Sequence, residues 1–366
     1  MAINAVPSFA ERVKTPRRVA DSVHSEDDAT NGNGGVSADG EQDEDVLNVA
    51  AEEVDARILP HDRCKKLISD EGPTELYLSS ARRWVAALLA DEGVYEPIEA
   101  RSRTAKAEIR TKATGRLAGL NAADLLIREW MPGAVFSWSA AEGSGVDAGQ
   151  SILTIEACRH QMLTCERTIL NLLGRLSGIA TNTARWAIAS QIPVAATRKT
   201  AWGVLDKAAV AVGGGLTHRL SRTDALMLKE NDLASTSVHG ERGALLVRNT
   251  LRDLPLETAG PFVTVEVRSL DEALAAAETW AERMLETGEG IRLNIMLDNM
   301  NPELTKDAVL DLQTRGLREY VTLEASGGIE FESLESWQGT GVDVLSSSAL
   351  HRATIPLDMT CIFHGA

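Results

Sequence analysis

From Arg167 onward, short apolar runs alternate with longer segments in which apolar residues recur at helical spacing. Each run is followed directly by polar side chains. Because apolar runs between helices are typical of strands buried on both faces, the pattern predicts a parallel β-sheet covered by helices. The expected strands are Pro193–Ala196, Ala225–Leu228, Phe262–Val265, Leu293–Leu297, Tyr320–Leu323 and Val342–Leu345. The expected helices are Ile169–Ser190, Glu241–Asp253, Leu270–Leu285, Pro302–Thr314 and Phe331–Trp337.

An incomplete β/α barrel is the architecture that this alternation favours. The polar residues gather after the strands, where the functional residues of such barrels lie. The six expected strands are fewer than the eight of a complete barrel. A doubly wound open sheet is the alternative. Neither a GxGxxG sequence after a strand nor a GxxxxGK[ST] sequence is present to support it.

The chain before Arg167 has a different pattern. Helical spacing marks Tyr77–Asp91 and Ala118–Met131, while Ala105–Leu117, Val135–Trp138 and Ile152–Ile155 resemble strands, so this part is expected to be α+β. Gly174 and Gly178 lie on one side of the next helix, which suggests close packing.

Length and charge divide the chain further. Its 366 residues favour more than one domain. Residues 1–55 hold thirteen acidic and four basic side chains, so they account for −9 of the net charge of −16 and are expected to form a disordered acidic tail. The acidic balance argues against a nucleic-acid-binding protein.

The remaining composition indicates a cytoplasmic protein. No apolar run reaches the 18 or so residues that span a bilayer, and the start of the chain lacks the apolar core of a signal peptide. The four cysteines show no metal-binding or redox spacing. We therefore expect no membrane partner and a reducing compartment.

Cationic side chains follow the first two expected strands. Arg198 and Lys199 end the first strand, His218 and Arg219 follow a triple glycine, and Lys229 ends the second strand. Each could face solvent separately. If the strand ends meet at one edge, however, these groups would repel one another unless an anion lies between them.

Acids and glycines follow the later strands. Glu266 and Asp298 end two strands separated by one β/α unit and could share Mg²⁺, which proteins hold with one or two carboxylates plus substrate phosphates; they could instead pair with the nearby cations. Ser326 and Gly327 begin a glycine loop before a helix, and such loops bind phosphate. The expected ligand is a polyanion, such as phosphoribosyl pyrophosphate with an aromatic acid.

Seven motifs in order between about residues 115 and 350 resemble the quinolinate phosphoribosyltransferase family, also called carboxylating nicotinate-nucleotide pyrophosphorylases. They are Glu166-Arg-Thr-Ile-Leu-Asn-Leu-Leu-Gly-Arg-Leu-Ser-Gly-Ile-Ala-Thr181, Thr197-Arg-Lys-Thr200, Gly213-Gly-Gly-Leu-Thr-His-Arg219, Leu228-Lys-Glu-Asn231, Val265-Glu-Val267, Leu297-Asp-Asn299 and Glu324-Ala-Ser-Gly-Gly328.

The resemblance implies a type II phosphoribosyltransferase fold. An α/β sandwich, residues 56–168 with 353–366, would pack on an incomplete β/α barrel, residues 169–352. The implied reaction transfers phosphoribose from phosphoribosyl pyrophosphate to quinolinate, releases pyrophosphate and CO₂, and gives nicotinate mononucleotide for NAD biosynthesis. Mg²⁺ is the implied cofactor.

The resemblance also assigns roles to individual residues. Lys199, Glu266 and Asp298 would be catalytic, with Glu266 and Asp298 near Mg²⁺ and the ribose. Arg167 would reach the neighbouring subunit of a homodimer with shared active sites, and the sequence does not distinguish this dimer from a hexamer. The residues implied to bind substrate are Arg167, Arg198, Lys199, His218, Arg219, Lys229, Glu266, Asp298, Ser326, Gly327 and Ser348.

Three departures from the family pattern bear on which base is accepted. Ala196 stands where the family usually has aspartate, Asp232 replaces a frequent histidine, and Ser348 replaces a glycine, which would narrow or rebuild one side of the phosphate site. A related phosphoribosyltransferase acting on nicotinate or another heterocyclic acid therefore stays open. The sequence also leaves open a non-catalytic homologue and a Schiff-base aldolase with Lys229 as nucleophile.

Overall fold

Six parallel strands form the sheet that the alternating pattern predicts. The computed structural model describes residues 59–101, 103–258 and 260–364, so the expected tail, 1–55, lies outside the described residues. The strand order is β8-β13-β12-β11-β10-β9, and among the described residues no ladder joins β8 to β9. The strands follow chain order around the sheet, with β8 beside β13, as in a β/α barrel, and the sheet stays open between β8 and β9. This order confirms the incomplete barrel. The strands are β8 (Val194–Ala195), β9 (Leu226–Leu228), β10 (Val263–Val267), β11 (Leu293–Asp298), β12 (Val321–Ser326) and β13 (Val344–Ser346).

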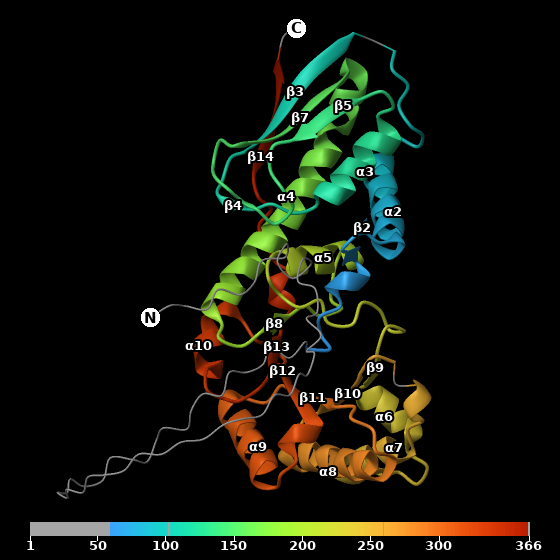
Figure 1. Cartoon of the computed structure of the whole chain (residues 1–366), viewed down its shortest axis with the longest axis vertical. Coiled ribbons are helices and arrows are strands. Elements are labelled where there is room, and N and C mark those ends of the chain that lie inside the picture. Colours follow the sequence, from blue (N-terminus) through green and yellow to red (C-terminus); the bar gives the residue numbers. More distant parts are fainter. Residues whose placement is uncertain (1–58, 102, 259, 365–366) are drawn as a thin grey trace, which may run out of the picture. The chain divides into compact units, whose positions relative to one another are not determined.

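Helices follow these strands along the chain. In Figure 1, α8 and α9 lie beside the ends of β10 and β11. The expected helices after β9 are present, whereas α5 and α6 were not predicted from the pattern. Every residue of α5 from Leu205 to Val212 is buried, so this helix has no polar face to reveal its period. The helices are α5 (Val204–Val212), α6 (Glu230–Thr236), α7 (Gly243–Asp253), α8 (Leu270–Thr287), α9 (Pro302–Thr314) and α10 (Leu334–Trp337).

Four further strands form a second, antiparallel sheet. Its order is β14-β3-β7-β5, so the C-terminal strand pairs with a strand from the first half of the chain. Two helices accompany it, and they match the expected positions within two residues. The elements are α2 (Glu75–Asp91), β3 (Thr104–Thr111), α3 (Leu120–Trp130), β5 (Val135–Trp138), β7 (Ser151–Cys158) and β14 (Met359–His364); the short strands are β1 (Ile68–Ser69), β2 (Gly72–Pro73), β4 (Gly115–Arg116) and β6 (Gly145–Val146).

Helix α4 (Arg159–Ala189) connects the two sheets. It begins ten residues before the expected start at Ile169, so the domain boundary predicted at residue 168 falls inside a helix and the boundaries stay a prediction. A Cβ on Gly178 would lie 2.3 Å from the carbonyl oxygen of Ile355, and one on Gly174 would lie 3.0 Å from that of Leu357. These glycines therefore allow the C-terminal segment to cross the helix closely, as the sequence suggested.

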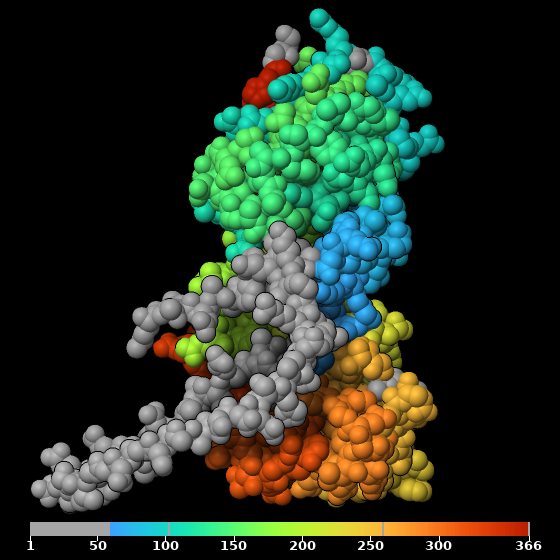
Figure 2. Space-filling model, viewed as in Figure 1, coloured from blue at the N-terminus to red at the C-terminus, as the bar shows by residue number. Residues whose placement is uncertain are grey.

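Residues from Pro60 onward belong to one unit, so the two sheets can be described together. In the space-filling view the blue segment after Pro60 touches both the green region, which carries the antiparallel sheet, and the yellow-orange region (Figure 2). Within the described ranges, no helix has the length and apolar character needed to cross a membrane.

Candidate active site

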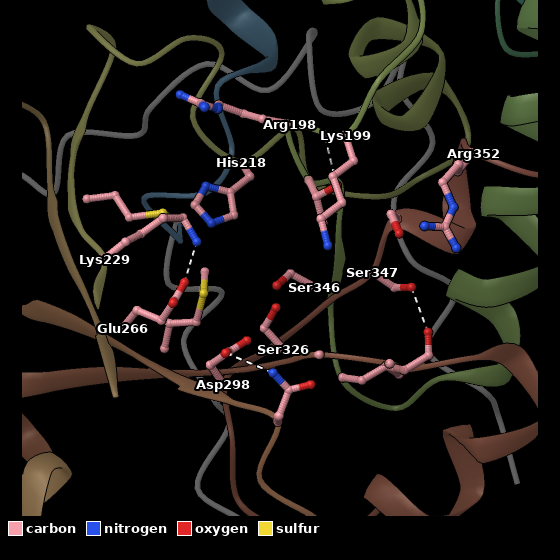
Figure 3. A pocket seen from close by; sticks show the side chains of 18 of the residues that line it. Arg198, Lys199, His218, Lys229, Glu266, Asp298, Ser326, Ser346, Ser347 and Arg352 are labelled. Carbon is pink, nitrogen blue, oxygen red and sulfur yellow. Dashed lines mark hydrogen bonds and ion pairs between the residues drawn. The ribbon is translucent and has the colours of Figure 1, made fainter. Parts of the chain in front are cut away.

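A cavity of about 420 Å³ opens at the carboxyl ends of the parallel strands. Ten of the eleven predicted site residues line it, and Figure 3 shows cationic and acidic side chains facing each other across it. Arg167 does not line it: this side chain is exposed on α4. The ten residues are Arg198, Lys199, His218, Arg219, Lys229, Glu266, Asp298, Ser326, Gly327 and Ser348.

The loop after β8 presents Arg198 and Lys199, which are exposed and make no ion pair within the described part of the chain. Asp206 anchors the end of this loop: its Oδ2 accepts hydrogen bonds from the backbone N–H of Ala201 at 2.8 Å and of Trp202 at 3.0 Å. The buried Asp206 carboxylate also receives a bidentate bond from Arg175 on α4. The two cations thus project from a braced loop.

Arg219 brings a buried cation to the same cavity. Its guanidinium is almost fully buried and donates to the carbonyl oxygen of Ala225 at 3.1 Å. Burial, together with the nearby Arg198, lowers the pKa of Arg219 to about 10. A pocket that disfavours a positive charge to this degree would gain from a bound anion.

The acids of the site already contact cations. Lys229 donates to Glu266, and Arg268 lies 3.4 Å from Asp298 and 3.9 Å from Glu266. Both carboxylates therefore lie near one guanidinium, and both are mostly buried, with side chains 8% and 15% exposed. Two such carboxylates in the lining of one cavity form a donor set that fits Mg²⁺. The alternative, pairing with cations, is the arrangement that this structure shows.

A glycine loop forms the floor beside the acids. Gly327 has φ +100°, and a Cβ there would lie 2.4 Å from Oδ1 and 2.7 Å from the backbone nitrogen of Asn299. The Asn299 N–H donates to the Ser326 carbonyl oxygen at 2.8 Å, which holds the two strand ends together. Only glycine fits this position, so the backbone here can approach a ligand closely.

The loop after β13 completes the cavity with serines and one further cation. Ser348 lines it, and the neighbouring Ser347 donates to the Ile329 carbonyl oxygen at 2.7 Å. Arg352 also lines the cavity, is exposed and makes no ion pair with any described residue. The sequence reasoning did not name Asn299 or Arg352 as site residues. Asn299 directly follows Asp298 at a strand end, whereas Arg352 comes seven residues after the expected strand Val342–Leu345.

Comparison with known proteins agrees with the motif resemblance. The profile described as "Quinolinate phosphoribosyl transferase, C-terminal domain" matches residues 179–361, and the corresponding "N-terminal domain" profile matches residues 93–177. A "Probable nicotinate-nucleotide pyrophosphorylase [carboxylating]" from Methanothermobacter thermautotrophicus is 35% identical over 266 residues, covering 71% of this chain and 88% of that protein. The Mycobacterium leprae "Nicotinate-nucleotide pyrophosphorylase [carboxylating]" is 36% identical over 254 residues, covering 67% and 81%.

A solved structure is similar as well. The nicotinate-nucleotide pyrophosphorylase of Francisella tularensis superimposes with a TM-score of 0.64 at 28% identity, covering 78% of this chain and 96% of that one. Because the family profiles cover most of the chain and these relatives share its sequence and fold, the chain belongs to the quinolinate phosphoribosyltransferase family.

Proposed function

We propose that this protein transfers phosphoribose from phosphoribosyl pyrophosphate to quinolinate, with loss of CO₂, to give nicotinate mononucleotide. The observation that carries the proposal is the charge distribution in the cavity. Arg198 and Lys199, which make no ion pair with a described residue, and the buried Arg219 line a space that also holds two carboxylates and a glycine loop. The names of the relatives support the same reaction.

The side chains of the cavity would act mainly by positioning. The planar guanidinium of Arg198 or Arg219 can bind a carboxylate with two parallel hydrogen bonds, so two cations can orient both carboxylates of quinolinate. This places the ring nitrogen in line with C1 of the ribose, and such positioning contributes up to about 7–11 kcal/mol in ideal cases. When the nitrogen forms its bond to C1, the bond between C1 and pyrophosphate breaks.

Decarboxylation follows from the positive charge that the ring nitrogen then carries. The electron pair of the bond between C2 and its carboxylate stays on the ring as CO₂ leaves, and the resulting carbanion takes a proton. We assign Lys199 as the donor, because its ammonium lines the cavity without an ion-pair partner among the described residues.

Glu266 and Asp298 would hold Mg²⁺, which when bound neutralises charge on the leaving pyrophosphate. For these acids to take that role, Lys229 and Arg268 must give up part of their present contacts to them. Ser326 and Gly327, which lie beside Asp298, would receive the 5′-phosphate together with Ser348.

The proposal includes a homodimer with shared sites. Arg167 is exposed on α4 and does not line the cavity of its own chain, so it is available to a second subunit. In a two-fold dimer each chain would give one Arg167 and receive one.

The direct test is incubation with phosphoribosyl pyrophosphate and Mg²⁺ while nicotinate mononucleotide is measured, with quinolinate and with nicotinate as separate substrates. Nicotinate lacks the 2-carboxylate and would leave a cation of the cavity unpaired, which costs about 1–3 kcal/mol per lost partner. We expect a large preference for quinolinate and release of CO₂. Equal efficiency with both acids would contradict the assignment of quinolinate, and absence of turnover with either would favour a non-catalytic homologue.

A further inference from the structure

A buried polar cluster lies beneath the cavity and includes a residue from outside the family match. His61 is completely buried, although it precedes residue 93, where the family profile begins. Its Nε2 lies 3.0 Å from Oε2 of Glu324, which is two residues before the end of β12 and is also completely buried. On the other side of this carboxylate, Nε2 of His218 lies 3.2 Å from Oε1.

The segment around His61 is held firmly in place. Arg63 forms a bidentate ion pair with Asp224 at 3.2 and 3.0 Å, and its backbone N–H donates to Oγ1 of Thr217 at 2.9 Å. Thr217 Oγ1 in turn donates to the His61 carbonyl oxygen at 3.2 Å. Thr217 directly precedes His218, so the segment that carries His61 is bonded to the loop that carries a cavity residue.

The hydrogen bonds around His218 define where its proton lies. The backbone N–H of Arg219 is 2.6 Å from Nδ1 of His218 and can only donate, so Nδ1 accepts. The proton of a neutral ring must then be on Nε2, which points at Glu324. Nδ1 thus accepts from the backbone, and Nε2 lies 3.2 Å from the buried carboxylate of Glu324.

Glu324 is the centre of this arrangement. Its Oε2 accepts from His61 and, at 2.7 Å, from Nδ2 of Asn294, which leaves Oε1 directed at His218. Burial alone would raise the pKa of Glu324, but His218 and the hydrogen bonds from both histidines outweigh it and hold this pKa well below its ordinary value. Glu324 is thus a buried carboxylate that needs all of its donors.

We infer that His61 is a positioning residue of the active site: through Glu324, it holds His218 as a neutral ring whose Nε2–H is directed away from the bound base. This inference rests on the proposed function only for its consequence in catalysis. The cations that meet the two carboxylates are then Arg198, Lys199, Arg219 and Lys229, while His218 forms a neutral wall.

The charged groups around His218 support a neutral ring. Burial lowers the pKa of His218, Glu324 opposes this effect, and His61 and Lys207 on α5 add to it. Removing His61 takes away an effect that lowers the pKa of His218. It also leaves the Glu324 carboxylate with one donor fewer, so that Glu324 raises the pKa of His218 more strongly. The His218 pKa should therefore rise when His61 is replaced by an apolar residue.

The same three side chains could be considered as metal ligands, because their ligand atoms lie within 4.8 Å of one another. In this geometry, however, Nε2 of His61 and Nε2 of His218 lie 3.0 and 3.2 Å from the carboxylate oxygens, and a ring nitrogen that carries a proton toward Glu324 is not a ligand. The hydrogen-bonded arrangement is the one that the structure favours.

The test measures the ring nitrogens of His218 by NMR in ¹⁵N-histidine-labelled full-length protein without substrate. The His218 signals are identified by their loss in His218→Gln. We expect the neutral Nε2–H form in the wild type and in His61→Gln, which keeps a donor without a charge. In His61→Phe we expect His218 to protonate at higher pH or to exchange between tautomers. His351→Gln, which removes another buried histidine outside the cluster, serves as the control and should leave the His218 signals unchanged.

Kinetics supply the second readout. His61→Phe should change the KM for quinolinate more than kcat, because it changes the charge or tautomer of a ring that lines the cavity, and His61→Gln should restore the wild-type KM. An unchanged His218 spectrum in a folded His61→Phe protein would overturn the inference. So would a wild-type His218 that is charged or protonated at Nδ1, or one zinc ion per chain bound to both histidines.

The two arms separate this inference from the proposed function. The spectrum of the wild type is decisive even if His61→Phe does not fold, and it requires no turnover. If the spectra agree with the expectation but no phosphoribosyl transfer is found, the proposed function is wrong and the positioning role of His61 stands. If turnover is normal but the spectra disagree, only the inference about His61 is wrong.

Discussion

Replacing Gly327 by alanine should damage the site more than the same change at the next residue. Both glycines have positive φ, +100° at Gly327 and +64° at Gly328. A Cβ on Gly328 would meet no atom within 4 Å, whereas a Cβ on Gly327 would lie 2.4 Å from the side chain and 2.7 Å from the backbone nitrogen of Asn299. The two variants therefore share the conformational cost and differ in the collision.

The shared cost is about 1–2 kcal/mol, the penalty for an alanine in the left-handed region. At Gly327, the collision with Asn299 must also be relieved by moving one of two strand ends that are bonded through the Asn299 N–H and the Ser326 carbonyl. Backbone shifts of this kind typically cost a further 1–3 kcal/mol or so. Gly327→Ala should therefore lose about twice the unfolding free energy lost by Gly328→Ala.

Urea unfolding monitored by circular dichroism measures the stability difference, and initial rates measure the KM for phosphoribosyl pyrophosphate. Because Gly327 lines the cavity at the proposed phosphate end, its alanine variant should raise this KM at least about tenfold, while the KM for quinolinate changes less. Equal losses of stability and equal KM values in the two variants would refute the close-approach argument.

The charges of the site support three more predictions. Arg352→Ala should raise the KM for phosphoribosyl pyrophosphate more than that for quinolinate, as initial rates would show, since Arg352 lies beside the serines of the cavity. Arg167→Ala and Lys199→Ala should each be nearly inactive, but refolded together they should recover about a quarter of wild-type activity through mixed dimers; a mixture that stays inactive while mixed dimers form would place Arg167 in its own site. Burial, with Arg198 and Arg219, lowers the pKa of Lys207 to about 7 in the folded protein. Above that pH the Lys207 amine binds more protons in the unfolded chain than in the folded one, so the free energy of unfolding should rise with pH. Between about pH 7.5 and pH 9 this rise is up to about 1.4 kcal/mol per pH unit, and Lys207→Met should remove it. Urea unfolding of both proteins at several pH values measures the difference.

The parallel sheet was predictable because its strands are buried on both faces. Their apolar runs stand out between helices such as α8 and α9. Each of these helices has one apolar and one polar face, and this pattern predicts the helix boundaries within two residues. The same reasoning failed for α5, which is buried on every side, and for the first turns of α4, where polar residues such as Arg159 and His160 obscure the helical period.

Most of the site was predictable for a related reason. Parallel strands end at one edge, so residues that follow different strands, such as Lys199, Glu266 and Asp298, meet in one cavity. Residues that reach the site from elsewhere carried no such signal. Arg352 lies beyond a turn that follows the last strand. His61, which lies beneath the cavity and contacts Glu324, comes from a segment more than a hundred residues before the sheet. Only the folded chain brings them there.

The balance of charge explains why the cavity is built for an anion. Ala196 is completely buried at the end of β8, where the family resemblance would place an aspartate, so this position offers no carboxylate to the adjacent Arg198 and Lys199. Glu266 and Asp298 contact Lys229 and Arg268 instead. Arg198 and Lys199 thus make no ion pair with any described residue. Burial first, and then repulsion by the charge of Arg198, lowers the pKa values of Arg219 and Lys207. A ligand with two carboxylates relieves that repulsion at two points, whereas a monocarboxylate relieves it at one, so the same imbalance of charge favours quinolinate over nicotinate.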